Sequence, residues 1–342
     1  MNPAEARRLG LRETPAAWEI EAGQGLRSLQ SLGLRFPGTT WDLKALGQVA
    51  ARYPVLVTPY YASLIERPEP GDPIFRQCAP SPEELVNSGD LSPDPLAEGK
   101  FMPAPGLVHR YPDRCLLLLT NACFVYCRHC LRKRIWGISQ GRYDRRHFLR
   151  MRDYLAATPS VREAILSGGD PLTLSNRELE FVLGSLRAIS HLEVIRIHTR
   201  APAVLPARID SGVLALLDRF GPIWLNTQFN HLREITEEAA AAVDRLLRAG
   251  VPVGNQGVLL KGINDDLETQ RALHLGLVRI KVRPYYLFHC DPAEGVGHFR
   301  TSVECGQRIV QELSRSLSGL AIPTFAMELP EGGGKVRMSL PG

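Results

Sequence analysis

The sequence predicts an α/β fold: a partial (β/α)6-type TIM barrel with an N-terminal helical and irregular extension and a short C-terminal segment. From Cys115 onward, short apolar runs alternate with amphipathic helical patterns about six times, which indicates parallel strands joined by helical crossovers. Polar clusters follow several of these runs, at the strand ends where barrels gather active residues. The length of 342 residues suits one barrel domain of about 200 to 250 residues with an extension.

The predicted strands are apolar runs bounded by turn residues. They are Cys115–Thr120, Ala164–Leu166, Glu193–His198, Ile223–Gln228, Pro252–Leu260, Arg279–Tyr286 and Ile322–Met327. Two helical patterns between them carry end signals. One opens at Ser175 with Glu178 three residues on, the spacing of a capping box. Another ends on Gly250, as a helix stop does.

Composition divides the chain into three parts. Residues 1–108 are interrupted by prolines, and their Pro-rich, acidic stretch at 66–108 predicts a helical and irregular wrap. Residues 109–320 hold the repeated pattern and form the expected barrel core. Residues 321–342 form a C-terminal segment that carries Lys335.

Charge and hydropathy exclude several classes of protein. Hydrophobic residues make up 44% of the chain, and no run approaches the roughly 18 apolar residues of a membrane span. The N-terminal residues mix charges of both signs, unlike an export signal, so we expect a cytoplasmic protein. The net charge of +5 is a mild excess that requires no nucleic-acid surface.

Three of the seven cysteines crowd into eight residues, in the order Cys123, Cys127, Cys130. In a reducing compartment such crowding indicates metal rather than disulfide. A structural zinc takes four protein ligands, and His129 lies between two of the cysteines where it is poorly placed to bind the same ion. An iron–sulfur cube has four irons, so three thiolates leave one iron open to an exogenous ligand. The spacing therefore favours a [4Fe–4S] cluster over a zinc loop or three core cysteines.

Further polar segments follow the other predicted strands. SGGDPL at 167–172 comes after the second strand, where its glycines let the backbone approach another group closely. HTR at 198–200, NTQFNH at 226–231 and GNQG at 254–257 follow later strands. We expect these segments to surround one site.

Lys335 stands after three glycines near the C-terminus. The chain has only six lysines, and a flexible glycine run lets a lysine reach into a site. Such a lysine suits a Schiff base with pyridoxal phosphate (PLP). The alternative is a frayed, solvent-exposed tail.

The cysteine segment resembles the radical SAM superfamily, and a longer set of motifs resembles its lysine 2,3-aminomutase family. The resemblance runs from TPYYASLI at 58–65 to the C-terminus, roughly four-fifths of the chain. Its motifs are HRYPDR (109–114), CFVYCRHC (123–130), LSGGDPL (166–172), WLNTQFNH (224–231), GNQGVLLKGIND (254–265), RPYYLFHCD (283–291), HFRT (298–301), IPTF (322–325) and GGGK (332–335).

The resemblance implies a PLP-dependent radical SAM enzyme on a partial barrel. It implies that S-adenosylmethionine (SAM) binds the open iron and yields a radical on C–S cleavage, and that the substrate's amino group then moves from C2 to C3. A low-potential electron donor such as flavodoxin or ferredoxin would reduce the cluster. The implied cofactor-binding residues are Arg110 and Arg114 for the PLP phosphate, Lys335 for its Schiff base, and Ser167, Gly168, Gly169, Asp170 and Gln256 for SAM.

The same resemblance implies a cationic amino acid as the substrate. Arg132 would bind its carboxylate, since a planar guanidinium suits a bidentate partner. Asp291 matches the first of two aspartates that hold the distant ammonium in the lysine enzymes, whereas the second position holds Glu328. Two carboxylates favour a cationic side chain. L-Lysine leads, and arginine and ornithine remain open, as does β-lysine supply for elongation factor P modification.

Two departures limit the resemblance. The chain ends soon after Lys335, and Asp266 stands where the lysine enzymes have a zinc-binding cysteine, so we expect no structural zinc. A homo-oligomer is therefore only one possibility. The competing hypothesis from another class is a zinc-stabilised basic module that binds nucleic acid through RHCLRKR at 128–134.

Overall fold

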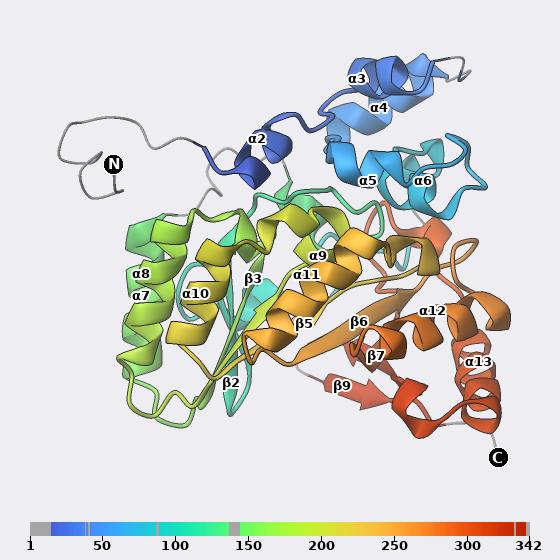
Figure 1. Ribbon diagram of the computed structural model, residues 1–342. Coiled ribbons are helices and arrows are strands. Elements are labelled where there is room, and N and C mark those ends of the chain that lie inside the picture. Colours follow the sequence, from blue (N-terminus) through green and yellow to red (C-terminus); the bar gives the residue numbers. More distant parts are fainter. Residues whose placement is uncertain are drawn as a thin grey trace.

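A single nine-stranded sheet organises the computed structural model, which describes residues 15–37, 39, 42–86, 89–136, 144–331 and 333–339. The strands pair in chain order, and the sheet curves into an incomplete barrel with helices on its outer face (Figure 1). The strands are β1 (Leu107–Tyr111), β2 (Arg114–Thr120), β3 (Glu163–Gly168), β4 (Val194–His198), β5 (Ile223–Thr227), β6 (Val253–Leu259), β7 (Arg283–His289), β8 (Thr324–Leu329) and β9 (Gly334–Arg337).

Strands β2 to β8 run parallel, while β1 and β9 pair antiparallel at the two edges. The crossovers contain α7 (Arg145–Ala156), α8 (Asn176–Arg187), α9 (Ala201–Val204), α10 (Ser211–Arg219), α11 (Glu237–Arg248), α12 (Leu267–Arg279) and α13 (Val303–Ser316). Short 3-10 turns lie at η3 (Lys133–Ile135), η5 (Pro171–Thr173), η6 (Pro206–Arg208), η7 (Leu232–Glu234), η8 (Gly297–Phe299) and η9 (Gly319–Ala321). The predicted partial (β/α)6-type barrel is thus confirmed.

Local signals explain why particular helices begin and end where they do. The Ser175 side chain accepts a hydrogen bond from the backbone N–H of Glu178, and the Glu178 carboxylate accepts one from the backbone N–H of Ser175, so α8 starts there as predicted. Gly250 adopts a φ of 72° just after α11, a backbone conformation that favours glycine. The prediction of a strand over Arg279–Tyr286 was wrong at its start: Arg279 is the last residue of α12, and the strand runs from Arg283 to His289.

The N-terminal extension packs over the carboxyl ends of the strands. It contains α2 (Ala17–Gly23), α3 (Leu29–Arg35), α4 (Leu43–Arg52), α5 (Pro59–Ser63), α6 (Pro73–Cys78), η1 (Pro82–Leu85) and η2 (Glu98–Phe101). The backbone of Tyr126, in the loop after β2, donates a hydrogen bond to Leu56, and Arg128 donates one to Gln77. The extension therefore positions the cysteine loop directly. No helix among the described residues is long and apolar enough to span a membrane.

Side chains bridge the open edge of the barrel. Arg110, on β1, donates a 2.6 Å hydrogen bond to the carbonyl of Leu329, at the end of β8. Tyr111 Oη donates one of 3.2 Å to the Glu328 carboxylate. Opposite Glu328 in the β8–β9 hairpin stands Lys335. The short antiparallel strands, which the sequence patterns did not indicate, thus bring the two ends of the barrel core together.

Candidate active site

One cavity of about 370 Å³ lies inside the barrel toward the carboxyl ends of the strands. Every site residue predicted from the sequence lines it, although they come from segments spread over more than 200 positions. They are Arg110, Arg114, Cys123, Cys127, Cys130, Arg132, Ser167, Gly168, Gly169, Asp170, Gln256, Asp291, Glu328 and Lys335.

The three clustered cysteines lie on the loop that leaves β2. None forms a disulfide, and each is partly exposed toward the cavity. Burial raises the pKa of Cys123 well above its usual range and that of Cys130 to about 11. Thiols in such surroundings stay protonated until a cation binds, because burial disfavours the anion.

The donor set fits an iron–sulfur cluster with one open iron. A further cysteine, Cys78, is buried, donates to the carbonyl of Ile74 and does not line the cavity. Cys115 lines the wall from within β2, away from the loop. Among the described residues, no three His, Cys, Asp or Glu side chains converge as they would around a single ion. Thiolates of a cluster bind different irons and need not converge on one point.

The glycine-rich loop after β3 packs directly on the cysteine loop. Gly168 has a φ of 118°, and a Cβ there would overlap the carbonyl of Thr120. A Cβ on Gly169 would overlap the carbonyl of Ala122, to which the backbone of Asp170 donates a 2.7 Å hydrogen bond. The glycines therefore permit a close approach between two loops of the site, a role in addition to the one predicted.

The Asp170 carboxylate is engaged within the protein. It accepts hydrogen bonds from the backbone of Leu172, the hydroxyl of Thr199 and the backbone of Arg200. Burial raises its pKa despite these bonds. Asp170 thus ties the loop after β3 to the loop after β4.

Lys335 lies at a cationic end of the cavity. Its Nζ atom is 3.6 Å from a carboxylate oxygen of Glu328 and 4.1 Å from the ring centre of Tyr286. Burial lowers the pKa of Lys335, and Arg196 and Arg114 lower it further while Glu328 opposes them. A lysine with a lowered pKa is a better nucleophile toward a carbonyl.

The same end fits the phosphate of PLP. Arg110 and Arg114 line the wall together with Arg196, which pairs with Glu163 across β3 and β4. The Nε atom of Arg110 is buried and has no hydrogen-bond partner among the described residues. Such an orphaned donor beside other arginines suits an anion.

Arg132 makes a buried ion pair that no residue spacing predicts. Its Nη2 atom lies 2.7 Å from Glu98, a residue of η2 in the N-terminal extension, and Arg134 pairs with the same carboxylate. Burial raises the pKa of Glu98, but the two guanidiniums outweigh it and lower the pKa to about 2. Glu98 engages only the Nε and Nη2 edge of Arg132. A second carboxylate could approach the remaining Nη1 donors.

Asp291 follows β7 and faces the same cavity. Burial, with the nearby charge of Glu328, raises the pKa of Asp291 to about 7. A carboxyl group with such a pKa ionises readily once a cation lies beside it. Asp291 and Glu328 therefore provide two carboxylates that favour a positive charge in the cavity, and Glu328 also pairs with Arg110 at 3.5 Å.

Several further polar side chains line the cavity. His198 bonds to Asn226 at 3.3 Å, and His129 bonds to Gln228 at 3.2 Å. Arg200 donates to Cys127, one of the three clustered cysteines. His198, Arg200, Asn226 and Gln228 belong to the polar segments that the sequence analysis identified at strand ends, without a role for each residue. His129 was considered there only as a poorly placed metal ligand.

Comparison with known proteins agrees with this geometry. The family model of the Radical SAM superfamily matches residues 117–272, which span the cysteine loop and the strands up to α12. Fold, cysteine loop and family match together define a radical SAM enzyme, not the nucleic-acid-binding module considered as the alternative.

Close relatives define the family within that superfamily. L-Lysine 2,3-aminomutase of Clostridium subterminale is 42% identical over 93% of this chain and 76% of the relative. The enzyme of the same name from Fusobacterium nucleatum subsp. nucleatum is 47% identical over 93% and 75%. Glutamate 2,3-aminomutase of Clostridioides difficile is 38% identical over 87% and 70%.

The chain belongs to the lysine 2,3-aminomutase family of radical SAM enzymes. It is accordingly an isomerase, an amino acid 2,3-aminomutase. Its cofactors are a [4Fe–4S] cluster, SAM and PLP.

Proposed function

We propose that this aminomutase acts on a cationic amino acid, with L-lysine as its preferred substrate, and moves the α-amino group to C3. One observation carries the proposal: Asp291 and Glu328 line the same cavity as Lys335, and the charge of Glu328 acts on Asp291. Two carboxylates attract a side-chain cation and repel an anion such as glutamate.

The proposed roles follow from the placement of each side chain. Cys123, Cys127 and Cys130 bind three irons of the cluster, and Ser167, Gly168, Gly169, Asp170 and Gln256 form the wall beside SAM. Lys335 binds PLP, and Arg110 and Arg114 bind its phosphate. When bound, these cofactors supply a radical that removes hydrogen and a carrier for the migrating nitrogen.

The substrate residues hold the amino acid at both ends. The free Nη1 side of Arg132 binds the carboxylate, while Glu98 fixes the guanidinium from the opposite edge. Asp291 and Glu328 bind the distant ammonium. Holding both ends restricts the substrate to one orientation, which aligns C2 and C3 with the reactive groups.

Product analysis tests this proposal. Anaerobically loaded enzyme is incubated with SAM, a reductant and L-lysine, L-arginine, L-ornithine or L-glutamate, and β-amino acids are measured by mass spectrometry. We expect the highest kcat/KM with L-lysine and no product from L-glutamate. Conversion of glutamate, or no β-amino acid from any cationic substrate, would refute the proposal. In Asp291→Asn the KM for lysine should rise.

The proposal extends to the surroundings of the enzyme. Seven free cysteines suit a reducing compartment, so we place the chain in the cytoplasm. The net charge of +5 favours an acidic one-electron donor of the flavodoxin or ferredoxin class. A homo-oligomer stays a prediction, which sedimentation analysis would test.

A further inference from the structure

We propose that Arg200 is a positioning residue that raises the reduction potential of the cluster by donating a hydrogen bond to Cys127, and that Glu234 limits this effect. The inference rests on the proposed role of Cys127 as a cluster ligand. It concerns residues that lie outside the substrate and PLP ends of the cavity.

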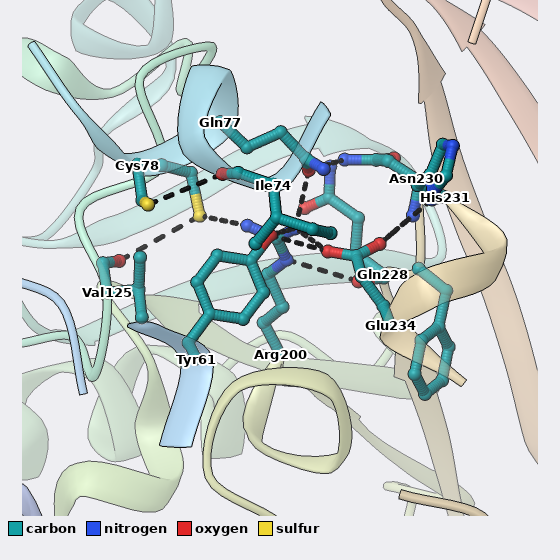
Figure 2. Close-up of polar contacts among 12 residues, drawn as sticks. Tyr61, Ile74, Gln77, Cys78, Val125, Arg200, Gln228, Asn230, His231 and Glu234 are labelled. Atoms are coloured by element: carbon teal, nitrogen blue, oxygen red, sulfur yellow. Dashed lines mark hydrogen bonds and ion pairs between the residues drawn. The ribbon is translucent and has the colours of Figure 1, made fainter. Parts of the chain in front are cut away.

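Arg200 approaches the cysteine loop, which follows β2, from the end of β4, two strands along the sheet. It follows β4, and its Nη1 atom lies 2.8 Å from the Sγ atom of Cys127. Its backbone N–H donates to Asp170, and its Nε atom donates to the carbonyl of Gln228 at 3.2 Å. The guanidinium is therefore held through its Nε atom, and its Nη1 edge is directed at the sulfur. Figure 2 shows Arg200 with Gln228 beside it.

Glu234 balances the charge of Arg200 on the side away from the sulfur. Its fully buried carboxylate lies 2.5 Å from Nη2 of Arg200 and accepts a hydrogen bond from Tyr61. Its second oxygen accepts from the backbone N–H groups of Asn230 and His231. Gln77 accepts from the same Nη2 atom at 2.6 Å. Figure 2 shows these groups converging on Arg200.

The expected sign follows from electrostatics. Reduction of the [4Fe–4S]2+ cluster by one electron to the 1+ state adds negative charge, which a neighbouring cation and N–H donors stabilise. Arg200 therefore favours the reduced cluster, and the buried carboxylate of Glu234 disfavours it. The potential shifts by the amount by which the hydrogen bond strengthens on reduction, and a strengthening of about 1.4 kcal/mol changes the ratio of reduced to oxidised cluster about tenfold.

The pair thus sets how easily an external donor delivers the electron. The donor is a low-potential one-electron reductant, which is oxidised by one electron as the cluster gains it. A buried ion pair suits this task because its groups are held in place and are not screened by water.

Potentiometric titration of the purified, cluster-loaded full chain tests the inference. With dithionite as reductant and without SAM, the reduced cluster is counted by electron paramagnetic resonance. At the wild-type midpoint, Arg200→Gln should lower the ratio of reduced to oxidised cluster about tenfold, about 59 mV for one electron. Glu234→Gln should raise the ratio, and Arg200→Lys should lie between wild type and Arg200→Gln.

Arg233→Gln is the matched control. Arg233 neighbours Glu234 but pairs with Asp72 at 2.9 Å and does not touch the cysteines. We expect its cluster potential to equal that of the wild type. General damage to the fold would move every variant in the same direction, whereas the inference requires opposite shifts for Arg200→Gln and Glu234→Gln.

Two results would contradict different claims. If the wild type binds its cluster and the reduction potentials of Arg200→Gln and Glu234→Gln both equal that of the wild type, this inference is overturned. The proposed function is unaffected by that result. Wild-type protein that takes up no cluster refutes the cysteine site itself. If Arg200→Gln fails to fold, shifts of the same sign in Arg200→Lys and Glu234→Gln overturn the inference.

Discussion

Replacement of Asp291 by asparagine should remove a pH dependence from substrate binding. Burial and the charge of Glu328 raise the pKa of Asp291 to about 7. A cationic side chain requires the ionised carboxylate, so binding must expel a proton whenever the pH is below that value. With a pKa of about 7, about one carboxyl in ten is ionised at pH 6 and about nine in ten at pH 8. The wild-type affinity for L-lysine should therefore fall about tenfold from pH 8 to pH 6 relative to Asp291→Asn.

Calorimetry on the enzyme loaded with cluster and PLP, without SAM, measures this difference without turnover. Titrations in buffers with different ionisation enthalpies also count the released protons, which should approach one per lysine at pH 6 in the wild type. Comparison with Asp291→Asn cancels the pH dependence of the substrate and of PLP. Equal slopes of affinity against pH in the two proteins would refute the assignment of Asp291 to the ammonium.

Three further predictions concern other parts of the site. Lys335→Ala should carry no PLP adduct after borohydride reduction, as measured by the mass of the intact chain. The control Lys100→Ala removes a lysine at an exposed ion pair and should keep the adduct. An adduct in Lys335→Ala contradicts the assignment of Lys335 to the Schiff base. Gly169→Ala should lower the free energy of unfolding by about 1–3 kcal/mol, because the added Cβ overlaps a carbonyl of the cysteine loop. The control Gly23→Ala, whose Cβ meets nothing within 4 Å, should not lower it. Equal denaturation midpoints in the two variants would contradict the close packing of Gly169 on the cysteine loop. Glu98→Ala leaves Arg132 and Arg134 without their shared carboxylate and should lower the free energy of unfolding by about 3–5 kcal/mol, measured by denaturation. An unchanged free energy of unfolding would show that the ion pair does not stabilise the fold.

Local patterns were sufficient to predict most of the barrel. The seven parallel strands are apolar runs between turns, and Ser175 with Glu178 marks a helix start that needs no tertiary information. The antiparallel strands β1 and β9 were missed because each is short and half polar, and is held by its neighbour in the sheet rather than by a pattern of its own. The start of β7 was misplaced because Ile280 and Val282 extend the apolar pattern but lie in the connection between α12 and β7, where Lys281 has a φ of 60°.

The candidate site was predictable where its chemistry depends on spacing along the chain. The three cysteines lie within eight residues, and the glycines after β3 follow a strand. Glu98 had no such signal, because its partner Arg132 is 34 residues away and only the folded chain brings them together. The link from Arg200 to Cys127 spans 73 residues for the same reason. Ion pairs between loops depend on topology, which residue spacing does not encode.

The cluster and its open iron support every later step, and magnetic resonance on the reduced enzyme tests them most directly. Electron–nuclear double resonance of the loaded chain is recorded with SAM that carries 15N in its amino group. We predict a 15N coupling to the cluster in the wild type, and loss of the cluster signal in Cys123→Ala. A reduced cluster without 15N coupling, or one whose fourth iron is bound by another side chain of this protein, would contradict the account.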